Sequence, residues 1–393
     1  MPTTPLQDLI IERIQREGST PFADYMRMAL YEPGYGYYVS GSARIGWEGD
    51  YFTSTDVSTL FAHCMGRQLS HMWEKLSHPA PFIVLEQGAG RGHLAQGVQT
   101  WATQEAPELS KALDYRTEDI SPGDKLASLV GATTYQGVDA TGKCSDTPCG
   151  YQGNGVDQLG NQSPVITPSV ILSNELIDAF PVHIVEKRDG RLYEVYVDVQ
   201  NGRLCEVLDE PSRPEVATHL DNYHIPWQTF EDGWRAEINL DALRWMERTA
   251  HLLRRGFVLT IDYGEKAREL YTREWPRGTL LCYFRHQLNE RPLLRPGEQD
   301  ITAHVNFSAL INEGRRHGLR LSKYTTQRLW LQDMGIDEEL ERLRKTEFSP
   351  LDSERATDKG QVALLKWYNL RQRVAALTDP AGMGDFKVLI QRR

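Results

Sequence analysis

The segment VLEQGAGRGHLA, residues 84–95, restricts the fold more than any other part of the chain. An apolar run ends on an acid, Glu86, and glycines follow at positions 88, 90 and 92. Glycine adopts positive φ without strain and lets the backbone approach a ligand closely. Ligands of parallel α/β sheets bind beyond the carboxyl ends of the strands, where such a turn lies. We therefore expect a strand, a cofactor-binding turn and a helix over about 93–105.

The residues around the glycines distinguish three classes of cofactor. A phosphate-binding loop needs Lys and then Ser or Thr after its last glycine, but His93 and Leu94 stand there. A dinucleotide-binding turn has the spacing G-x-G-x-x-G, and Glu86 would repel its pyrophosphate. S-adenosylmethionine carries a sulfonium and an ammonium group and no phosphate, so a carboxylate favours its binding. The turn therefore favours S-adenosylmethionine over NAD, with a nicotinamide-dependent oxidoreductase as the alternative.

A second strand is predicted in LDYRTEDISP, and it ends on Glu118 and Asp119. A carboxylate at this place can accept hydrogen bonds from both hydroxyls of a ribose. NAD enzymes use such an acid too, and acids at strand ends also cap helices. These two residues therefore indicate a ribose without choosing the cofactor.

Strands and helices alternate through the middle of the chain. This alternation predicts an α/β protein with a parallel, doubly wound sheet. The expected strands lie in PFIVLEQ, LDYRTEDISP, ATTYQGVDA, SVILSNELIDAFPVH and FVLTIDYG, with two more in GTLLCYF and LRLSKYTTQRLWL. Between the fourth and fifth, RDGR and QNGR contain the Asp-Gly and Asn-Gly pairs typical of β-hairpins.

We divide the chain into three parts. Residues 1–80 form a helical N-terminal extension and a Tyr- and Gly-rich lid loop, with Ser54 or Thr55 expected to cap the helix that follows. Residues 81–335 form the core, with an insertion loop at 142–166 and a β-hairpin and helical insertion at about 182–238. Residues 336–393 form a C-terminal helical segment and a final strand.

Composition excludes several classes of protein. The formal charge of −10 argues against a general nucleic-acid-binding surface. The five scattered cysteines predict no metal site and suit reduced thiols. No apolar run approaches the about 18 residues of a transmembrane helix. The N-terminus resembles neither a signal nor a transit peptide, so a cytoplasmic location without membrane contact is expected.

The stretch SNELIDAFPVH ends the predicted fourth strand, on the edge that faces a transferred methyl group. Glu175 and Asp178 follow Asn174 and share a face if the chain turns helical. Two carboxylates there could hold a cationic acceptor, and a guanidinium pairs with carboxylates in a bidentate manner. The alternative is that both acids only cap a helix.

The order of several longer motifs resembles that of the MidA-type S-adenosylmethionine-dependent methyltransferases. The motifs are LYEPGYGYY, GDYFTSTDVSTLF, LEQGAGRGHLA, NELIDAFPVH, IDYG, GTLLCYFRH and DITAHVNFSAL. The mitochondrial members of this family are complex I assembly factors with protein-arginine methyltransferase activity. The resemblance implies a Rossmann-like, seven-stranded methyltransferase sheet with a helical N-terminal extension, and it does not include the insertion at 142–166.

The resemblance also assigns individual residues. It places the cofactor against Glu86, Gly88, Gly90, Gly92, Asp119, Asn174, Thr53 and Asp56, the last two in a lid that also contains Asp50. It makes Glu175, Asp178 and His286 the catalytic candidates, and it matches Asp300, Thr302 and His304 to a motif of less clear role. For His304, a structural role is the better expectation.

The acceptor is the least determined part of this interpretation. A protein substrate methylated on arginine is expected, and small-molecule, oxygen or nitrogen acceptors stay open. A non-catalytic assembly module that keeps the fold is a second alternative. A homodimer would use the hairpin segment as its contact surface.

Overall fold

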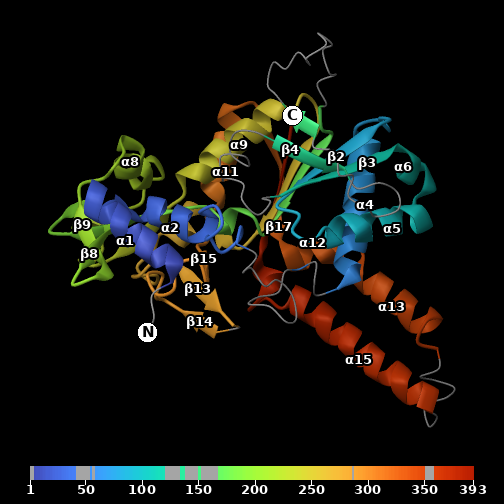
Figure 1. Ribbon diagram of the computed structural model, residues 1–393. Helices are drawn as coiled ribbons and strands as arrows, with labels where there is room; N and C mark the ends of the chain where they lie inside the picture. Colours follow the sequence, from blue (N-terminus) through green and yellow to red (C-terminus); the bar gives the residue numbers. More distant parts are fainter. Residues whose placement is uncertain are drawn as a thin grey trace.

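The computed structural model describes residues 4–40, 54, 58–119, 133–137, 149–151, 167–285, 287–349 and 358–393. Asp50, Thr53, Asp56 and His286, which the sequence singles out, lie outside these ranges. The described chain forms a large sheet with helices on both faces, beside a second lobe that contains α1 and α2 (Figure 1). Within this described part, no helix has the length and apolar character needed to span a membrane.

The main sheet has eight strands in the order β17-β18-β11-β6-β2-β3-β4-β5. The central strands β3, β2, β6 and β11 run parallel, whereas β18 is antiparallel to both its neighbours and β4 is antiparallel to β3. The strands are β2 (Phe82–Gln87), β3 (Leu113–Glu118), β4 (Thr133–Gly137), β5 (Cys149–Tyr151), β6 (Val170–Asn174), β11 (Phe257–Asp262), β17 (Arg320–Thr326) and β18 (Lys387–Arg392).

The α/β class predicted from the sequence is confirmed, but the sheet is mixed rather than wholly parallel and has eight strands rather than seven. The strand β18 lies between β11 and β17, although it is the last strand of the chain. A short apolar run carries no mark of its direction or its partner strands. The direction of such a strand and its partner strands depend on which surfaces become buried when the whole chain folds.

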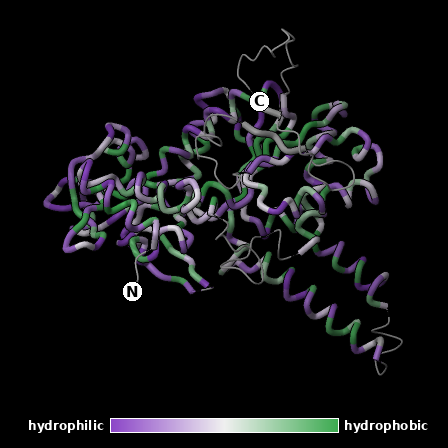
Figure 2. Tube along the Cα trace, viewed as in Figure 1, coloured by the Kyte–Doolittle hydropathy of each residue, from purple (hydrophilic) through white to green (hydrophobic). Residues whose placement is uncertain are grey.

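Helices cover both faces of the main sheet. The first face packs against α4 (Thr59–Lys75), α5 (His93–Glu105), α6 (Pro107–Ala112), α12 (Gln327–Asp333), α13 (Ile336–Thr346) and α15 (Asp358–Thr378). The second face packs against α9 (Leu240–Leu252) and α11 (Phe307–Arg316). Side chains alternate along the strands, so that Leu172 joins the first core and Ile171 the second. Burial on both faces explains the continuous hydrophobic runs of the central strands (Figure 2).

The second lobe is an antiparallel sheet on which the helices α1, α2 and α8 pack. The residues between β6 and β11 supply most of its strands, and the Asp189-Gly190 and Asn201-Gly202 pairs turn its hairpins with positive φ at all four residues. Its elements are α1 (Pro5–Glu17), β1 (Thr20–Pro21), α2 (Phe22–Tyr31), β7 (His183–Arg188), β8 (Arg191–Gln200), β9 (Arg203–Asp209), α8 (Pro214–Asn222) and β10 (Arg235–Ile238).

Two local predictions are wrong. The run GTLLCYF was expected in the main sheet, but its strand β13 (Leu281–Phe284) pairs with β14 (Gln287–Asn289) and β15 (Asp300–Thr302) in a separate sheet. The helix α4 is capped by the hydroxyl of Ser58 rather than by Ser54, and Thr55 lies outside the described residues. The sequence offers more than one sheet for an apolar strand and more than one hydroxyl for a helix cap. Packing of the folded chain selects between them.

One further short strand pair joins β12 (Gly264–Glu265) to β16 (Val305–Asn306).

The contact between α4 and α5 allows a direct test of this packing. A Cβ added to Gly66 would lie 2.1 Å from the ring of Trp101, which is 6% exposed. We expect Gly66→Ala to lower the free energy of unfolding by about 1–3 kcal/mol, because overpacking forces the helices apart. Urea denaturation measures this change. Ser70→Ala, one turn further along α4, should stay within about 0.5 kcal/mol of wild type, and equal stabilities of the two variants would contradict the packing described.

Candidate active site

The glycine turn joins β2 to α5 at the carboxyl edge of the main sheet. Gly88, Gly90 and Gly92 have φ of 74°, 54° and 73°, in the left-handed region that side chains rarely adopt. A Cβ on Gly88 would lie 2.8 Å from Leu176 Cδ1, whereas a Cβ on Gly90 or Gly92 would meet no described atom within 4 Å. The first glycine therefore packs against the chain, and the other two border open space.

The end of β3 lies against this turn. The backbone amide of Gly88 donates to the carbonyl of Glu118 at 2.8 Å, and the amide of Gly90 donates to the carboxylate of Asp119. The Gln87 side chain donates to Glu118 Oε2 at 2.9 Å. The two acids predicted at the second strand end thus border the glycine turn, and burial raises the pKa of Glu118 to about 7.

Glu86 lies beneath the turn and is 3% exposed. Its Oε2 accepts a hydrogen bond of 3.0 Å from the hydroxyl of Tyr115. Burial raises the pKa of Glu86 to about 8, and the hydrogen bond from Tyr115 opposes this shift. A cation bound nearby would favour the ionised carboxylate, so the protonation of Glu86 is sensitive to the charge of a ligand in the turn.

A cluster of three carboxylates lies at the ends of the neighbouring strands β6 and β11: Asp178 and Asp262 are buried, and Glu175 is half-buried. Glu175 has a φ of 50° and leads into the short helix η1 (Ile177–Ala179), which contains Asp178. Asp262, the last residue of β11, accepts hydrogen bonds from the amides of Ile177 at 2.9 Å and Asp178 at 3.4 Å. Asp262 therefore fixes the turn that positions the other two acids.

Burial, and for two of these acids a neighbouring carboxylate, makes the cluster hard to ionise. Burial raises the pKa of Glu175 to about 7, and the nearby Asp178 carboxylate adds to the shift. Burial likewise raises the pKa of Asp178 to about 6. The pKa of Asp262 is raised by burial and by both neighbours. Strongly perturbed acids of this kind gather at functional sites.

One carboxylate oxygen of Asp178 accepts a hydrogen bond, and the other is buried and can accept one from a ligand. The hydroxyl of Tyr263 donates to Asp178 Oδ2, and no donor among the described residues reaches Asp178 Oδ1. Sequence reasoning assigned no role to Asp262 or Tyr263, although it noted the motif IDYG. The available sequence signal was an acid at the end of a predicted apolar strand. Only the structure shows that this strand pairs with β6, with Ile261 in register with Asn174.

The glycine turn and the acid cluster are in contact through Leu176. Leu176, which packs on Gly88, follows Glu175 directly in the chain. Asn174 Nδ2 donates to Glu175 Oε1 at 3.2 Å, and the amide of Ser54 donates to the same oxygen at 2.7 Å. The structure thus brings together the glycine turn, Asn174 and Glu175, as the sequence predicted.

A pocket of about 370 Å³ is lined in part by Tyr263, whose hydroxyl donates to Asp178. Aromatic rings line it, with the Tyr263 and His304 rings 5.4 Å apart and the Tyr263 and Phe386 rings 5.3 Å apart. Burial lowers the pKa of His304 to about 4, so this ring is neutral at pH 7. Acidic side chains also line the pocket: Glu265, Glu269 and Asp385.

The stability of the ligand-free protein should depend on Glu86. Its pKa of about 8 lies above the usual 4.5, so the folded state holds more protons between these values. The free energy of unfolding then falls as pH rises, by up to about 1.4 kcal/mol per pH unit. Glu86→Gln keeps the acceptor for Tyr115 and removes the titration. We expect its melting temperature to fall less than that of wild type between pH 6 and pH 8; equal slopes in thermal unfolding would contradict this.

Comparison with known proteins decides the class of this site. A family model of S-adenosyl-L-methionine-dependent methyltransferases matches residues 64–325. The chain belongs to this family. The family and the cofactor predicted from the sequence are therefore confirmed, and the protein is an S-adenosylmethionine-dependent methyltransferase.

Individual relatives agree over most of their length. The chain is 28% identical to the mitochondrial protein arginine methyltransferase NDUFAF7 homolog of Drosophila melanogaster over 406 residues, covering 96% of this chain and 82% of that protein. It is 27% identical to the human NDUFAF7 protein over 355 residues, covering 87% and 76%. A crystal structure from Burkholderia thailandensis, bound to S-adenosyl-homocysteine, has a TM-score of 0.76 at 28% identity and covers 99% of this chain and 92% of that one.

The described residues fit this cofactor. Open space borders Gly90 and Gly92, and buried acids lie beside and beneath the turn, which suits a ligand that is cationic and lacks phosphate. A side chain at Gly90 would enter this open space.

Gly90→Val tests the turn. The φ of 54° strains any L side chain, and the valine would occupy the open space, so we expect S-adenosyl-homocysteine to bind at least about 10-fold more weakly by calorimetry. Gly190→Val is the matched control, because Gly190 has a φ of 73° in a hairpin of the second lobe. Unchanged affinity in Gly90→Val, or equal losses in both variants, would contradict the assignment.

Proposed function

We propose that this methyltransferase transfers the methyl group of S-adenosylmethionine to a guanidinium nitrogen of an arginine side chain in a protein. The observation that carries the proposal is the pair of half-buried Glu175 and buried Asp178, which adjoins the glycine turn and offers Asp178 Oδ1, an oxygen that accepts no hydrogen bond from the described residues. A guanidinium presents a fork of donors that matches carboxylate oxygens. The relatives named protein arginine methyltransferases support the same acceptor.

The cofactor would be held by Gly88, Gly90 and Gly92, with Asp119 at the ribose and Glu86 beneath the turn. When bound, it supplies an electrophilic methyl group on a sulfonium. Because methyl transfer is an in-line displacement, most of the gain comes from positioning the acceptor and excluding water.

The acid cluster would bind, orient and finally deprotonate the acceptor. An approaching guanidinium favours the ionised forms of Glu175 and Asp178, whose burial makes the pairing strong. A nitrogen–carbon bond forms as the carbon–sulfur bond breaks, and the electron pair stays on sulfur. The methylated guanidinium then loses one N–H proton to a carboxylate. The pKa values of about 7 and 6 place Glu175 and Asp178 near the range suited to this acceptance.

The pocket beyond Tyr263 would admit the acceptor side chain. Its aromatic walls favour a flat cation, through cation–π contact with Tyr263 and Trp275. Lys387 pairs with Glu265 at 2.6 Å and with Asp385 at 3.0 Å, which leaves the acidic side chains of the wall in excess over this lysine. A protein segment carrying a positive charge therefore suits this opening better than a neutral or anionic one.

Three further expectations belong to the proposal. His286, Thr53 and Asp56 keep their predicted roles in catalysis and cofactor binding. Seven strands of the main sheet, in the order β4-β3-β2-β6-β11-β18-β17, would form the predicted methyltransferase sheet, with β5 added at its edge and the hairpin lobe as the insertion between β6 and β11. The relatives compared above are named mitochondrial, and a cytoplasmic location for this chain stays a prediction.

Asp178→Asn tests the acceptor site. Asparagine keeps the shape but cannot pair with the cation or take its proton, so we expect methyl transfer to fall about 100-fold or more. Affinity for S-adenosyl-homocysteine should stay within a few-fold of wild type. The assay follows labelled methyl groups from the cofactor into arginine-containing peptides and into the same peptides with lysine instead.

The exposed Asp337→Asn is the matched control and should transfer at the wild-type rate. Equal labelling of arginine and lysine peptides would contradict the guanidinium assignment. The same assay is also run with the proteins of a cell extract as acceptors. If the protein binds the cofactor saturably but labels neither peptides nor extract proteins, the alternative is favoured, namely a non-catalytic assembly module that has kept the fold.

A further inference from the structure

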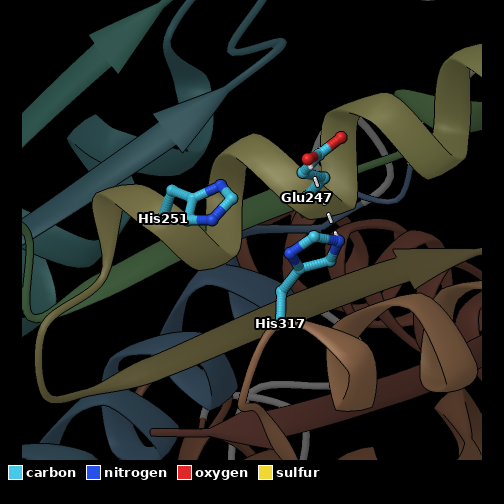
Figure 3. Close-up of side chains that lie close together, drawn as sticks. All are labelled: Glu247, His251 and His317. Carbon is cyan, nitrogen blue, oxygen red and sulfur yellow. Dashed lines mark ion pairs between the residues drawn. The ribbon is translucent and has the colours of Figure 1, made fainter.

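A second group of ligand-type side chains lies on the helices α9 and α11, away from the glycine turn. Glu247 and His251 project from successive turns of α9, and His317 follows the end of α11 (Figure 3). One ligand atom of each side chain lies within 4.8 Å of the others. The three residues differ in sequence position by up to 70, so spacing along the chain does not reveal the cluster.

The geometry suits a small divalent ion. Residues four apart share one face of a helix, which places Glu247 and His251 side by side. His317 Nε2 lies 3.9 Å from Glu247 Oε1, and the rings of His251 and His317 are 5.0 Å apart. Metal–ligand bonds of about 2.0–2.2 Å in a tetrahedral site place ligand atoms about 3.3 Å apart. Small rotations would close the cluster, because the Glu247 side chain is 47% exposed and that of His317 is 22% exposed.

A further carboxylate, Glu313, lies beside the cluster. Its Oε1 is a hydrogen-bond partner of His317 Nε2 at 3.0 Å, and an ion bound at that nitrogen would replace this hydrogen bond. Two carboxylates and two neutral imidazoles would together neutralise a divalent cation. Imidazole ligands favour zinc and its transition-metal neighbours over magnesium and calcium, which prefer sites made of oxygen ligands alone.

We propose that Glu247, His251 and His317 bind one zinc-class divalent ion, which joins α9 to the end of α11. This site is independent of the acceptor proposed above. Trp245, on the same helix α9, donates from Nε1 to Gln87 Oε1 at 2.9 Å, directly before the glycine turn. An ion that ties α9 to α11 therefore stabilises the helix that supports the cofactor edge.

Metal titration of the full chain tests this site. After treatment with EDTA and dialysis, we expect zinc chloride to bind with one-to-one stoichiometry and to raise the melting temperature. Cobalt chloride should give the visible absorption bands of a tetrahedral or five-coordinate Co²⁺ site with imidazole ligands. His251→Ala and His317→Ala should each weaken zinc binding at least about 10-fold.

His71→Ala is the matched control, since His71 is exposed on α4 and lies outside the cluster. It should bind zinc as wild type does. Circular dichroism of each variant shows whether it folds, and the cobalt spectrum of wild type tests the site without any substitution. Wild type without saturable binding of one equivalent, or equal binding by wild type and both cluster variants, would overturn the proposal.

Discussion

The hydrogen bonds from the amides of Ile177 and Asp178 to the Asp262 carboxylate determine the shape of the active site. They tie the end of β11 to the turn after β6, so that two strands position one set of side chains. The same turn carries Leu176 onto Gly88 and thereby sets the distance between the acid cluster and the glycine turn. Together with the hydrogen bond from Tyr263 to Asp178 Oδ2, this tie fixes the place of Asp178 relative to the glycine turn.

The second constraint is electrostatic. Several acids are buried at one edge of the sheet, and burial raises the pKa of each: Glu86, Glu118, Glu175, Asp178 and Asp262. Burying carboxylates without cations is costly. A cationic cofactor and a cationic acceptor would each offset part of that cost, so the free protein carries an edge that is suited to two positively charged ligands and to no phosphate.

The sequence was sufficient to predict the parts of the site that depend on local chemistry. The glycine spacing predicts both the turn and the helix His93–Glu105, and the Asp-Gly and Asn-Gly pairs predict the hairpins of the second lobe. The sequence did not allow us to predict contacts between segments far apart in the chain. The role of Asp262 depends on β11 lying beside β6, and the antiparallel place of β18 depends on burial that no local pattern encodes.

The central claim is that the buried acids beside the cofactor turn select an arginine side chain. Mass spectrometry of methylated residues in cells with and without this gene tests it most directly. The account predicts a protein methylarginine that disappears on deletion, returns with the wild-type gene and does not return with Asp178→Asn. Loss of a methylated lysine, carboxylate or small molecule instead, with all methylarginines intact, would contradict it.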